Sequence, residues 1–228
     1  MAIDIGICNG SNSLKSFIEM AHKIGYRGLA SQNIEGARDQ QLESGFSVLK
    51  RADVSGRGLK SIRKKVDNVR KHVMVVSVTL STVETANWAA EDTRVDLITL
   101  DHSNEERLRE STAKLASLSN TALEIRIEPL IQLTGLNRSK VIKFYRESVN
   151  TATASGMSVV LSSGATHPLN MRSPISIQYV GELLGMEAEL AKDAINKFPM
   201  DIIERNRRKF SSNYIMEGVE VVQRGIDE

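Results

Sequence analysis

The chain has 228 residues, of which 41% are hydrophobic and 25% are charged, and this balance excludes a disordered chain. Its 30 basic and 28 acidic residues leave a net charge of +2, which is too small to indicate a nucleic-acid-binding protein by itself. The single cysteine, Cys8, excludes an internal disulfide and an all-cysteine metal site. No apolar run approaches the roughly 20 residues of a membrane span and no signal peptide is evident, so we expect a cytoplasmic protein with one domain over residues 1–228.

Short β-rich runs alternate with helical patterns along the chain. The expected elements, in chain order, are a strand at residues 3–7, a helix at 11–24, strands at 27–30 and 46–49, a helix at 56–71, a strand at 73–78, a helix at 82–92, a strand at 95–100, a helix at 104–118, a strand at 123–127, a helix at 138–155 and a strand at 157–161. Three more helices follow, at residues 174–184, 187–197 and 199–209.

Glycines and prolines mark where several of these helices begin and end. Gly25 and Gly156 suit the left-handed position that follows a helix. Pro174 and Pro199 suit the first helical position, where the missing N–H costs nothing. The polar residues 11–13 can cap the first helix.

The alternation of strands and helices predicts parallel strands joined by right-handed helical crossovers. We expect an α/β fold, an irregular TIM-barrel-like domain with about seven strands and extra C-terminal helices. A closed barrel of this type has eight strands, so an eighth strand in the tail at residues 218–223 is an open possibility. A flat doubly wound sheet is the alternative, but the turn at residues 8–11 lacks the glycine-rich phosphate loop that is typical of such sheets.

Catalytic residues of a parallel barrel lie at the C-terminal ends of its strands. The polar candidates at these places are Asn9, Asp101, His102, Glu128 and Ser162. One divalent ion would take its ligands from Asp101, His102, Glu128 and His167. The alternative, which we favour, is that Asp101 and His102 cap the following helix and bond to local backbone.

Candidate nucleophiles have equally little support in the sequence. Ser162 and Ser163 lie outside any G-x-S-x-G elbow, and Cys8 is more typical of an inert buried thiol. We therefore expect no catalytic residue and no metal site in this chain.

Basic residues gather on three helical segments. They are Arg57, Lys60, Arg63, Lys64, Lys65, Arg70 and Lys71 in the first, Arg138, Lys140, Lys143 and Arg146 in the second, and Arg205, Arg207, Arg208 and Lys209 in the third. A basic helix face is often only a solvated surface. On a nearly neutral chain, however, three such groups indicate that charge is segregated, which suits RNA on one side and protein partners on another. With only 4% aromatic residues, recognition of RNA shape and backbone is favoured over base stacking.

A strand-loop-helix block carries the most specific pattern. It runs Ser162-Ser163-Gly164-Ala165, then Met171-Arg172-Ser173-Pro174, then Leu183-Leu184-Gly185-Met186 and residues 191–195. With the opening strand and the segments 127–130 and 218–222, this block resembles ribonuclease P protein component 3, the archaeal relative of the thirty-kilodalton subunit of the eukaryotic enzyme, over most of the chain.

The resemblance implies an irregular α/β barrel, distantly similar to metal-dependent phosphoesterases of the polymerase and histidinol phosphatase type. Those enzymes place a His-x-His pair after the first strand, where this chain has Ile7, Cys8 and Asn9, so that metal site is not carried over. The resemblance further implies that cleavage of the 5′ leader from precursor tRNA belongs to the holoenzyme, whose catalytic RNA acts with Mg²⁺. The implied partners are ribonuclease P RNA, protein component 2 as the direct partner, the other ribonuclease P protein subunits and precursor tRNA.

The loop at residues 164–173 suits a phosphate contact. Gly164 allows a sharp turn, Ser173 can cap the helix that Pro174 begins, and Arg172 stands beside the free N–H groups of that helix. A capped loop with a solvated arginine is an equally good interpretation. The residues expected to bind RNA are Arg172, Arg138, Lys140, Arg57, Lys60 and Lys64, and the motif residues are Ser163, Gly164, Ala165, Ser173 and Pro174.

Three hypotheses follow for the function. The leading one is a non-catalytic subunit that assists a catalytic RNA by binding RNA and protein. The alternative is an independent metal-dependent phosphoesterase of barrel fold. The third is a scaffold that binds protein partners and scarcely touches RNA.

Overall fold

Seven parallel strands form most of a barrel in the computed structural model, which describes residues 2–10, 13–104, 106–216 and 219–220. In order around the sheet they are β1 (Ile3–Ile7), β2 (Gly28–Ser31), β4 (Ser47–Val54), β5 (Val75–Thr79), β6 (Leu97–Thr99), β7 (Ala122–Arg126) and β8 (Val159–Ser162). β3 (Asp39–Gln41) pairs antiparallel with β4 and forms a hairpin at its side. The predicted barrel of about seven strands is therefore confirmed.

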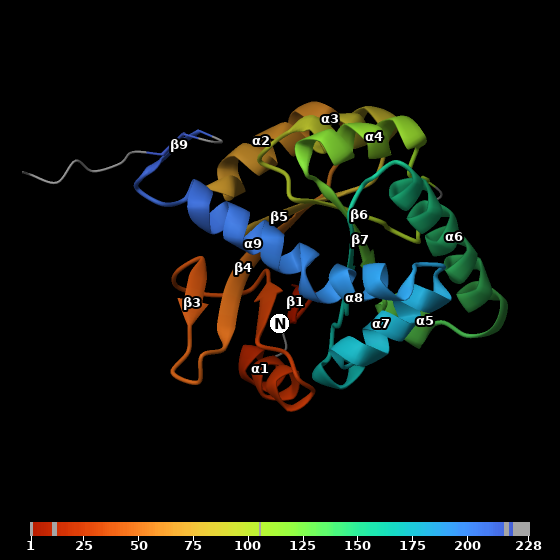
Figure 1. The fold of residues 1–228 in the computed structure, drawn as a ribbon, viewed down its shortest axis with the longest axis horizontal. Helices are drawn as coiled ribbons and strands as arrows, with labels where there is room; N and C mark the ends of the chain where they lie inside the picture. Colours follow the sequence, from red (N-terminus) through yellow and green to blue (C-terminus); the bar gives the residue numbers. More distant parts are fainter. Residues whose placement is uncertain (1, 11–12, 105, 217–218, 221–228) are drawn as a thin grey trace, which may run out of the picture.

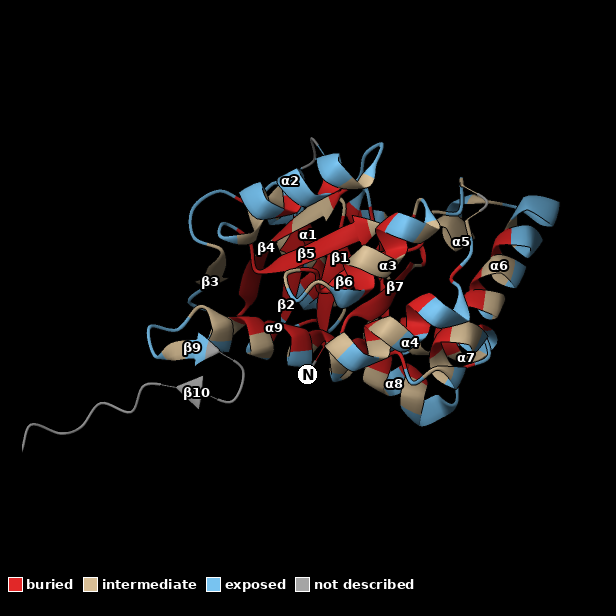
Figure 2. Cartoon of the chain, turned by 90° about the horizontal axis from the view of Figure 1, so that it is seen from above, coloured by how far each residue is buried: buried red, intermediate tan, exposed pale blue. Residues whose placement is uncertain are grey.

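Helices surround this sheet (Figure 1). They are α1 (Leu14–Lys23), α2 (Leu59–Arg70), α3 (Val83–Glu91), α4 (Glu110–Ser119), α5 (Glu128–Gln132), α6 (Gly135–Ala154), α7 (Pro174–Leu183), α8 (Ala188–Asn196) and α9 (Phe198–Lys209), with a 3-10 turn η1 (Pro168–Asn170) before α7. Figure 2 shows the strands buried at the centre, while α2 and α6 expose their outer faces. None of the described helices is long and apolar enough to cross a membrane.

Helix α9 covers the end of the barrel where the strands begin. Its Asn206 Nδ2 donates to the carbonyl of Met74, one residue before β5, at 2.9 Å, and to Asp96 Oδ1, one residue before β6, at 2.8 Å. Ile202 and Ile203 pack into an apolar cluster inside this end of the barrel. The extra C-terminal helices thus complete the core, because they fill an end that strands alone leave open to water.

The edge strands β1 and β8 close the barrel without a regular ladder between them. Cys8 N donates to Ala165 O at 3.0 Å, and Ser163 N donates to Asp4 Oδ1 at 3.1 Å. Gly6 allows this close approach, since a Cβ there would lie 2.4 Å from both Glu124 Oε1 and Ser162 Oγ. A glycine in β1 therefore sets the narrow seam of the barrel.

Several sequence-based boundaries were wrong. The strand expected at residues 46–49 continues to Val54, because Arg51 and Asp53 form ion pairs inside the barrel that hold the chain extended beyond Leu49. The helix expected from residue 104 begins at Glu110, since Asn104 is held in a turn by bonds to Leu80 O and from Glu106 N. Strand β3 and the short helix α5 were not expected at all.

The tail does not complete the barrel. Residues 218 and 221–223 of the expected eighth strand lie outside the described residues. The described part, β10 (Val219–Glu220), pairs antiparallel with β9 (Tyr214–Met216) in a separate two-stranded sheet. The helix ends were predicted better: Gly25 and Gly156 have φ values of 100° and 75°, the left-handed conformation that follows a helix.

Candidate functional site: barrel interior and basic surfaces

The barrel interior is layered, with an apolar layer below a polar one. Near the strand starts, the inward residues are Leu49, Val75, Leu97, Ala122 and Val160, which pack together in one cluster. Two positions further along the same strands stand Arg51, Ser77, Thr99, Glu124 and Ser162, all buried. Because side chains alternate along a strand, these polar residues point into the same interior.

Glu124 is the centre of the polar layer. Its Oε1 accepts from Arg51 Nη1 and from Ser162 Oγ, both at 2.7 Å. Its Oε2 accepts from Arg51 Nη2 and from Thr99 Oγ1. Neither Glu124 nor Arg51 exposes any of its side chain. A buried pair of this kind holds its charge only because each charged atom has a hydrogen-bonding partner.

Asp53 and Arg126 extend this network towards the barrel mouth. Arg51 Nε donates to Asp53 Oδ1 at 2.7 Å, and Arg126 Nη2 lies 2.8 Å from Asp53 Oδ2. Burial pushes the pKa of Glu124 up, but Arg51 and Arg126 outweigh it and hold this pKa at about 2. Burial likewise opposes ionisation of Asp53, yet the same two arginines lower its pKa. The interior therefore contains two guanidinium groups and two carboxylates that neutralise each other.

A cavity of about 320 Å³ opens above this network. Its lining includes Cys8, Asp101, His102, Arg126 and Glu128, so the structure brings together several residues that the sequence placed at strand ends. Burial raises the pKa of the Cys8 thiol, which keeps it protonated and a poor nucleophile.

The side chains around this cavity do not fit a metal ion. Asp101 Oδ1 accepts from Ser103 N at 2.9 Å, and Glu128 Oε1 accepts from Thr166 N at 2.9 Å and Asn170 Nδ2 at 3.0 Å. These two carboxylate oxygens thus already accept hydrogen bonds from local donors. In the part of the chain that the structure describes, no group of three or more histidine, cysteine, aspartate or glutamate residues could hold a metal ion.

The motif residues 163–165 join β8 to its two neighbouring strands. Ser163 N donates to Asp4 of β1, and the Ser163 hydroxyl accepts from Ala165 N at 3.1 Å. Gly164 has a φ of 65°, and a Cβ there would lie 2.8 Å from Arg126 Cβ. The glycine is required both for the turn and for its contact with β7.

The second half of the motif builds the start of α7. Ser173 accepts from Ser176 N at 3.3 Å, and Pro174 occupies the first helical turn, as expected. Arg172 is half-buried, and its Nη1 donates to Leu169 O and Met171 O at 2.9 and 2.8 Å. Its Nε and Nη2 form a fork that has no partner among the described residues. Arg172 does not pair with Glu128, whose Oε1 is bonded to Thr166 and Asn170.

The predicted RNA-binding residues on α2, just before α2 and on α6 lie on the outside of the molecule. Arg57, Lys60, Lys64 and Lys140 are exposed and, among the described residues, have no carboxylate within ion-pair distance. Arg138 is half-buried, and its Nε donates to Leu133 O at 2.6 Å. Arg172 lies on a third segment, and the structure does not gather these six residues into one pocket.

Other basic residues of the three helical groups have structural partners. Arg70 and Arg205 both form ion pairs with Asp96, and Arg207 forms one with Asp39. The pairs with Asp96 join α2 and α9 to the end of the barrel where the strands begin, and the pair with Asp39 joins α9 to β3. The third basic group is thus partly an internal ion-pair network, which the sequence pattern did not reveal.

Comparison with known proteins places these features in context. A model of the RNase P subunit p30 family matches residues 1–211. Ribonuclease P protein component 3 of Methanosarcina barkeri is 28% identical over 225 residues, which cover 95% of this chain and 92% of that protein.

Two solved structures share the fold. A chain in the cryo-EM structure of archaeal ribonuclease P with mature tRNA has a TM-score of 0.80 at 17% identity, and the match covers 97% of this chain and 99% of that one. Histidinol phosphate phosphatase from Lactococcus lactis, complexed with zinc, L-histidinol and phosphate, has a TM-score of 0.50 at 10% identity over 81% of this chain. At these identities, both likenesses show the barrel fold alone.

Proposed function

Because the chain belongs to the RNase P subunit p30 family, we propose that it is a non-catalytic protein subunit of ribonuclease P, which removes the 5′ leader from precursor tRNA. The observation that carries this proposal is the match of the family model to residues 1–211, which include all seven strands of the barrel and helices α1 to α9. Cleavage is assigned to the catalytic RNA of the holoenzyme together with Mg²⁺. This chain assists by binding RNA and protein, and acts in the cytoplasm as one domain.

The contribution of the chain to the RNA is electrostatic. Lys60 and Lys64 extend from α2 and Arg57 lies two residues before it, while Arg138 and Lys140 extend from α6. Cations on the protein screen the repulsion between phosphates of the catalytic RNA and those of precursor tRNA. The enzyme then needs less magnesium to bring the two RNAs together.

The contribution of the chain to protein assembly is assigned to the outer face of α7. Ile175, Tyr179 and Leu183 repeat every four residues on this helix and are 61%, 62% and 49% exposed. Such a stripe is typical of a surface that a partner covers. The motif residues that resemble component 3 bracket α7, since Ser173 and Pro174 begin it and Gly185 follows it. We assign the stripe to protein component 2, the direct partner, alongside other ribonuclease P protein subunits.

The alternative of an independent phosphoesterase receives no support from the site. The likeness to histidinol phosphate phosphatase concerns the fold, whereas Glu124 and Asp53 inside this barrel are paired with Arg51 and Arg126. Function is decided by such side chains and not by the fold.

The test is reconstitution of cleavage with catalytic RNA, with and without the chain and component 2. We expect the protein pair to lower the magnesium concentration at which cleavage is optimal, and an unchanged optimum would contradict the proposal. The chain alone, given precursor tRNA without the RNA subunit, is expected to show no turnover. Robust RNA-free cleavage that Asp101→Ala abolishes would instead establish the phosphoesterase alternative.

A further inference from the structure

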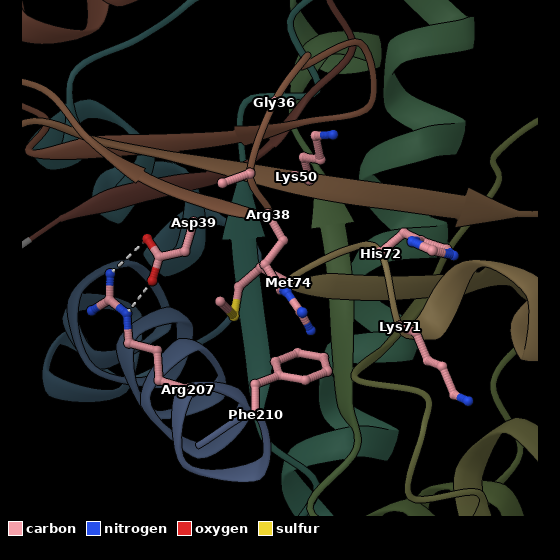
Figure 3. A pocket seen from close by; sticks show the side chains of 10 residues that line it. Gly36, Arg38, Asp39, Lys50, Lys71, His72, Met74, Arg207 and Phe210 are labelled. Atoms are coloured by element: carbon pink, nitrogen blue, oxygen red, sulfur yellow. Dashed lines mark hydrogen bonds and ion pairs between the residues drawn. The ribbon is translucent and has the colours of Figure 1, made fainter. Parts of the chain in front are cut away.

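A basic pocket lies beside the C-terminal end of α9, the helix that covers the end of the barrel where the strands begin (Figure 3). Its volume is about 500 Å³, a size that suits a small ligand or one nucleotide. Three segments form it: the β3–β4 hairpin, the turn between α2 and β5, and the end of α9. The residues that line it include Arg38, Asp39, Lys50, Lys71, His72, Met74, Arg207 and Phe210. We call this site the basal pocket.

The basal pocket has an excess of positive charge. Arg207 and Asp39 satisfy each other through bonds of 2.7 and 3.1 Å, drawn in Figure 3. Arg38, Lys50 and Lys71 remain, and among the described residues none of them has a carboxylate within ion-pair distance. Three like charges around one cavity repel each other, and an anion that enters the cavity relieves this repulsion.

A favourable position at the end of a helix explains only one of these three cations. Lys71 follows the last turn of α2, where a cation offsets the carbonyl end of the helix. Arg38 and Lys50 come from the hairpin, so no helix end explains them. The Arg38 guanidinium lies 4.0 Å from the centre of the Phe210 ring, and this contact holds its charge in place at the pocket.

The pocket also continues a line of cations on α2. Lys64 and Lys71 follow Lys60 by four and eleven positions, close to whole numbers of helical turns. The three lysines therefore lie on one side of the helix over roughly 16 Å. A line of cations of this length suits the successive phosphates of a nucleic-acid backbone, whereas a small anion would be bound by the cations of the pocket alone.

We propose that the basal pocket binds a backbone phosphate of RNA, held by Arg38, Lys50 and Lys71, with His72 at its edge. This inference rests on the proposed function, because it assigns the RNA to a definite surface. It adds a contact at the strand-start end of the barrel, remote from Arg172 and the motif loop.

The test compares two double variants in the complex of the chain with component 2 and catalytic RNA. Lys50→Gln/Lys71→Gln removes two charges from the basal pocket. Lys23→Gln/Arg109→Gln removes two exposed cations elsewhere that also have no ion pair. We expect the log–log salt slope of RNA binding to fall by about two in the pocket variant and to stay unchanged in the control. Melting temperature confirms that both variants fold.

Other outcomes overturn the inference in distinguishable ways. An unchanged salt slope in the pocket variant, while the wild-type chain still lowers the magnesium optimum, rejects the pocket and leaves the proposed function intact. If the wild-type chain neither binds the RNA nor changes that optimum, the proposed function itself fails. Another outcome is that the His72 NMR chemical shifts change and level off at micromolar inorganic phosphate or mononucleotide, while the salt slope of RNA binding is unchanged in the pocket variant. That result identifies a small phosphate ligand. If the pocket variant binds component 2 more weakly than the wild-type chain does in the absence of RNA, the occupant of the pocket is an acidic surface of that protein.

Discussion

Arg51 and Glu124 face each other inside the barrel as a bidentate ion pair from which water is excluded. Arg51 comes from β4 and Glu124 from β7, so the bond spans the interior between strands that are not neighbours in the sheet. The pair ties the two sides of the barrel together at the level of the polar layer.

Removing one partner of this pair should be strongly destabilising. Glu124→Ala leaves the guanidinium of Arg51 buried and only partly paired, and we expect a loss of about 3–5 kcal/mol in the free energy of unfolding. The double variant Arg51→Met/Glu124→Leu should recover most of that loss, since the remaining charges, Asp53 and Arg126, still pair with each other. Urea denaturation of the single and double variants measures both effects. A loss below about 1 kcal/mol for Glu124→Ala would show that the pair is unimportant.

The same pair predicts a loss of stability in acid. The pKa of Glu124 is about 2 in the folded protein against an ordinary 4.5, so the unfolded chain takes up its proton first as the pH falls. The stabilisation from Glu124 is therefore complete above about pH 5 and is lost progressively towards pH 2. Glu124→Gln should flatten the stability profile in that window when unfolding is followed by urea at each pH. A variant with the wild-type slope there would assign the acid sensitivity to other carboxylates.

Gly6 should be intolerant of any side chain. An alanine Cβ would lie 2.4 Å from Glu124 Oε1 and Ser162 Oγ, so either the polar layer or strand β1 must shift. We expect Gly6→Ala to cost about 1–3 kcal/mol of unfolding free energy. Gly56→Ala is the matched control, because its Cβ would meet nothing nearer than Lys65 Nζ at 3.3 Å, the end of a flexible side chain. Equal thermal stability of the two variants would contradict a tight seam.

The sequence predicted the order of strands and helices well, because hydrophobic periodicity and helix ends are local signals. Gly25, Gly156 and Pro174 all fulfilled their expected roles. The described part of the tail does not join the barrel as an eighth strand, because it pairs with β9 instead. Such pairing of a short segment depends on partners that local sequence does not reveal.

The polar layer could not be found from local pattern alone. Charged residues at alternate positions, as in Arg51 and Asp53 or Glu124 and Arg126, are normally a sign of a solvated strand face. Only the closure of the barrel turns them inward and brings Arg51 to Glu124, 73 positions away. The basal pocket was missed for the same reason, because its cations come from separate segments that the fold brings together.

Arg172 gives the sharpest test of the motif loop. Nη1 is bonded to two carbonyls of the loop, while the fork of Nε and Nη2 remains available beside the start of α7. If the fork holds a backbone phosphate, Arg172→Ala should lower the log–log salt slope of RNA binding by about one, equally for different precursor tRNAs. Arg172→Lys should restore only part of the effect, because an ammonium cannot form the paired contacts of a guanidinium. Arg109→Ala, which removes an exposed arginine without an ion pair, is the control. Should Arg172→Ala lower the melting temperature and leave the salt slope unchanged, the arginine serves to brace the loop through Leu169 and Met171, and the phosphate contact must be abandoned.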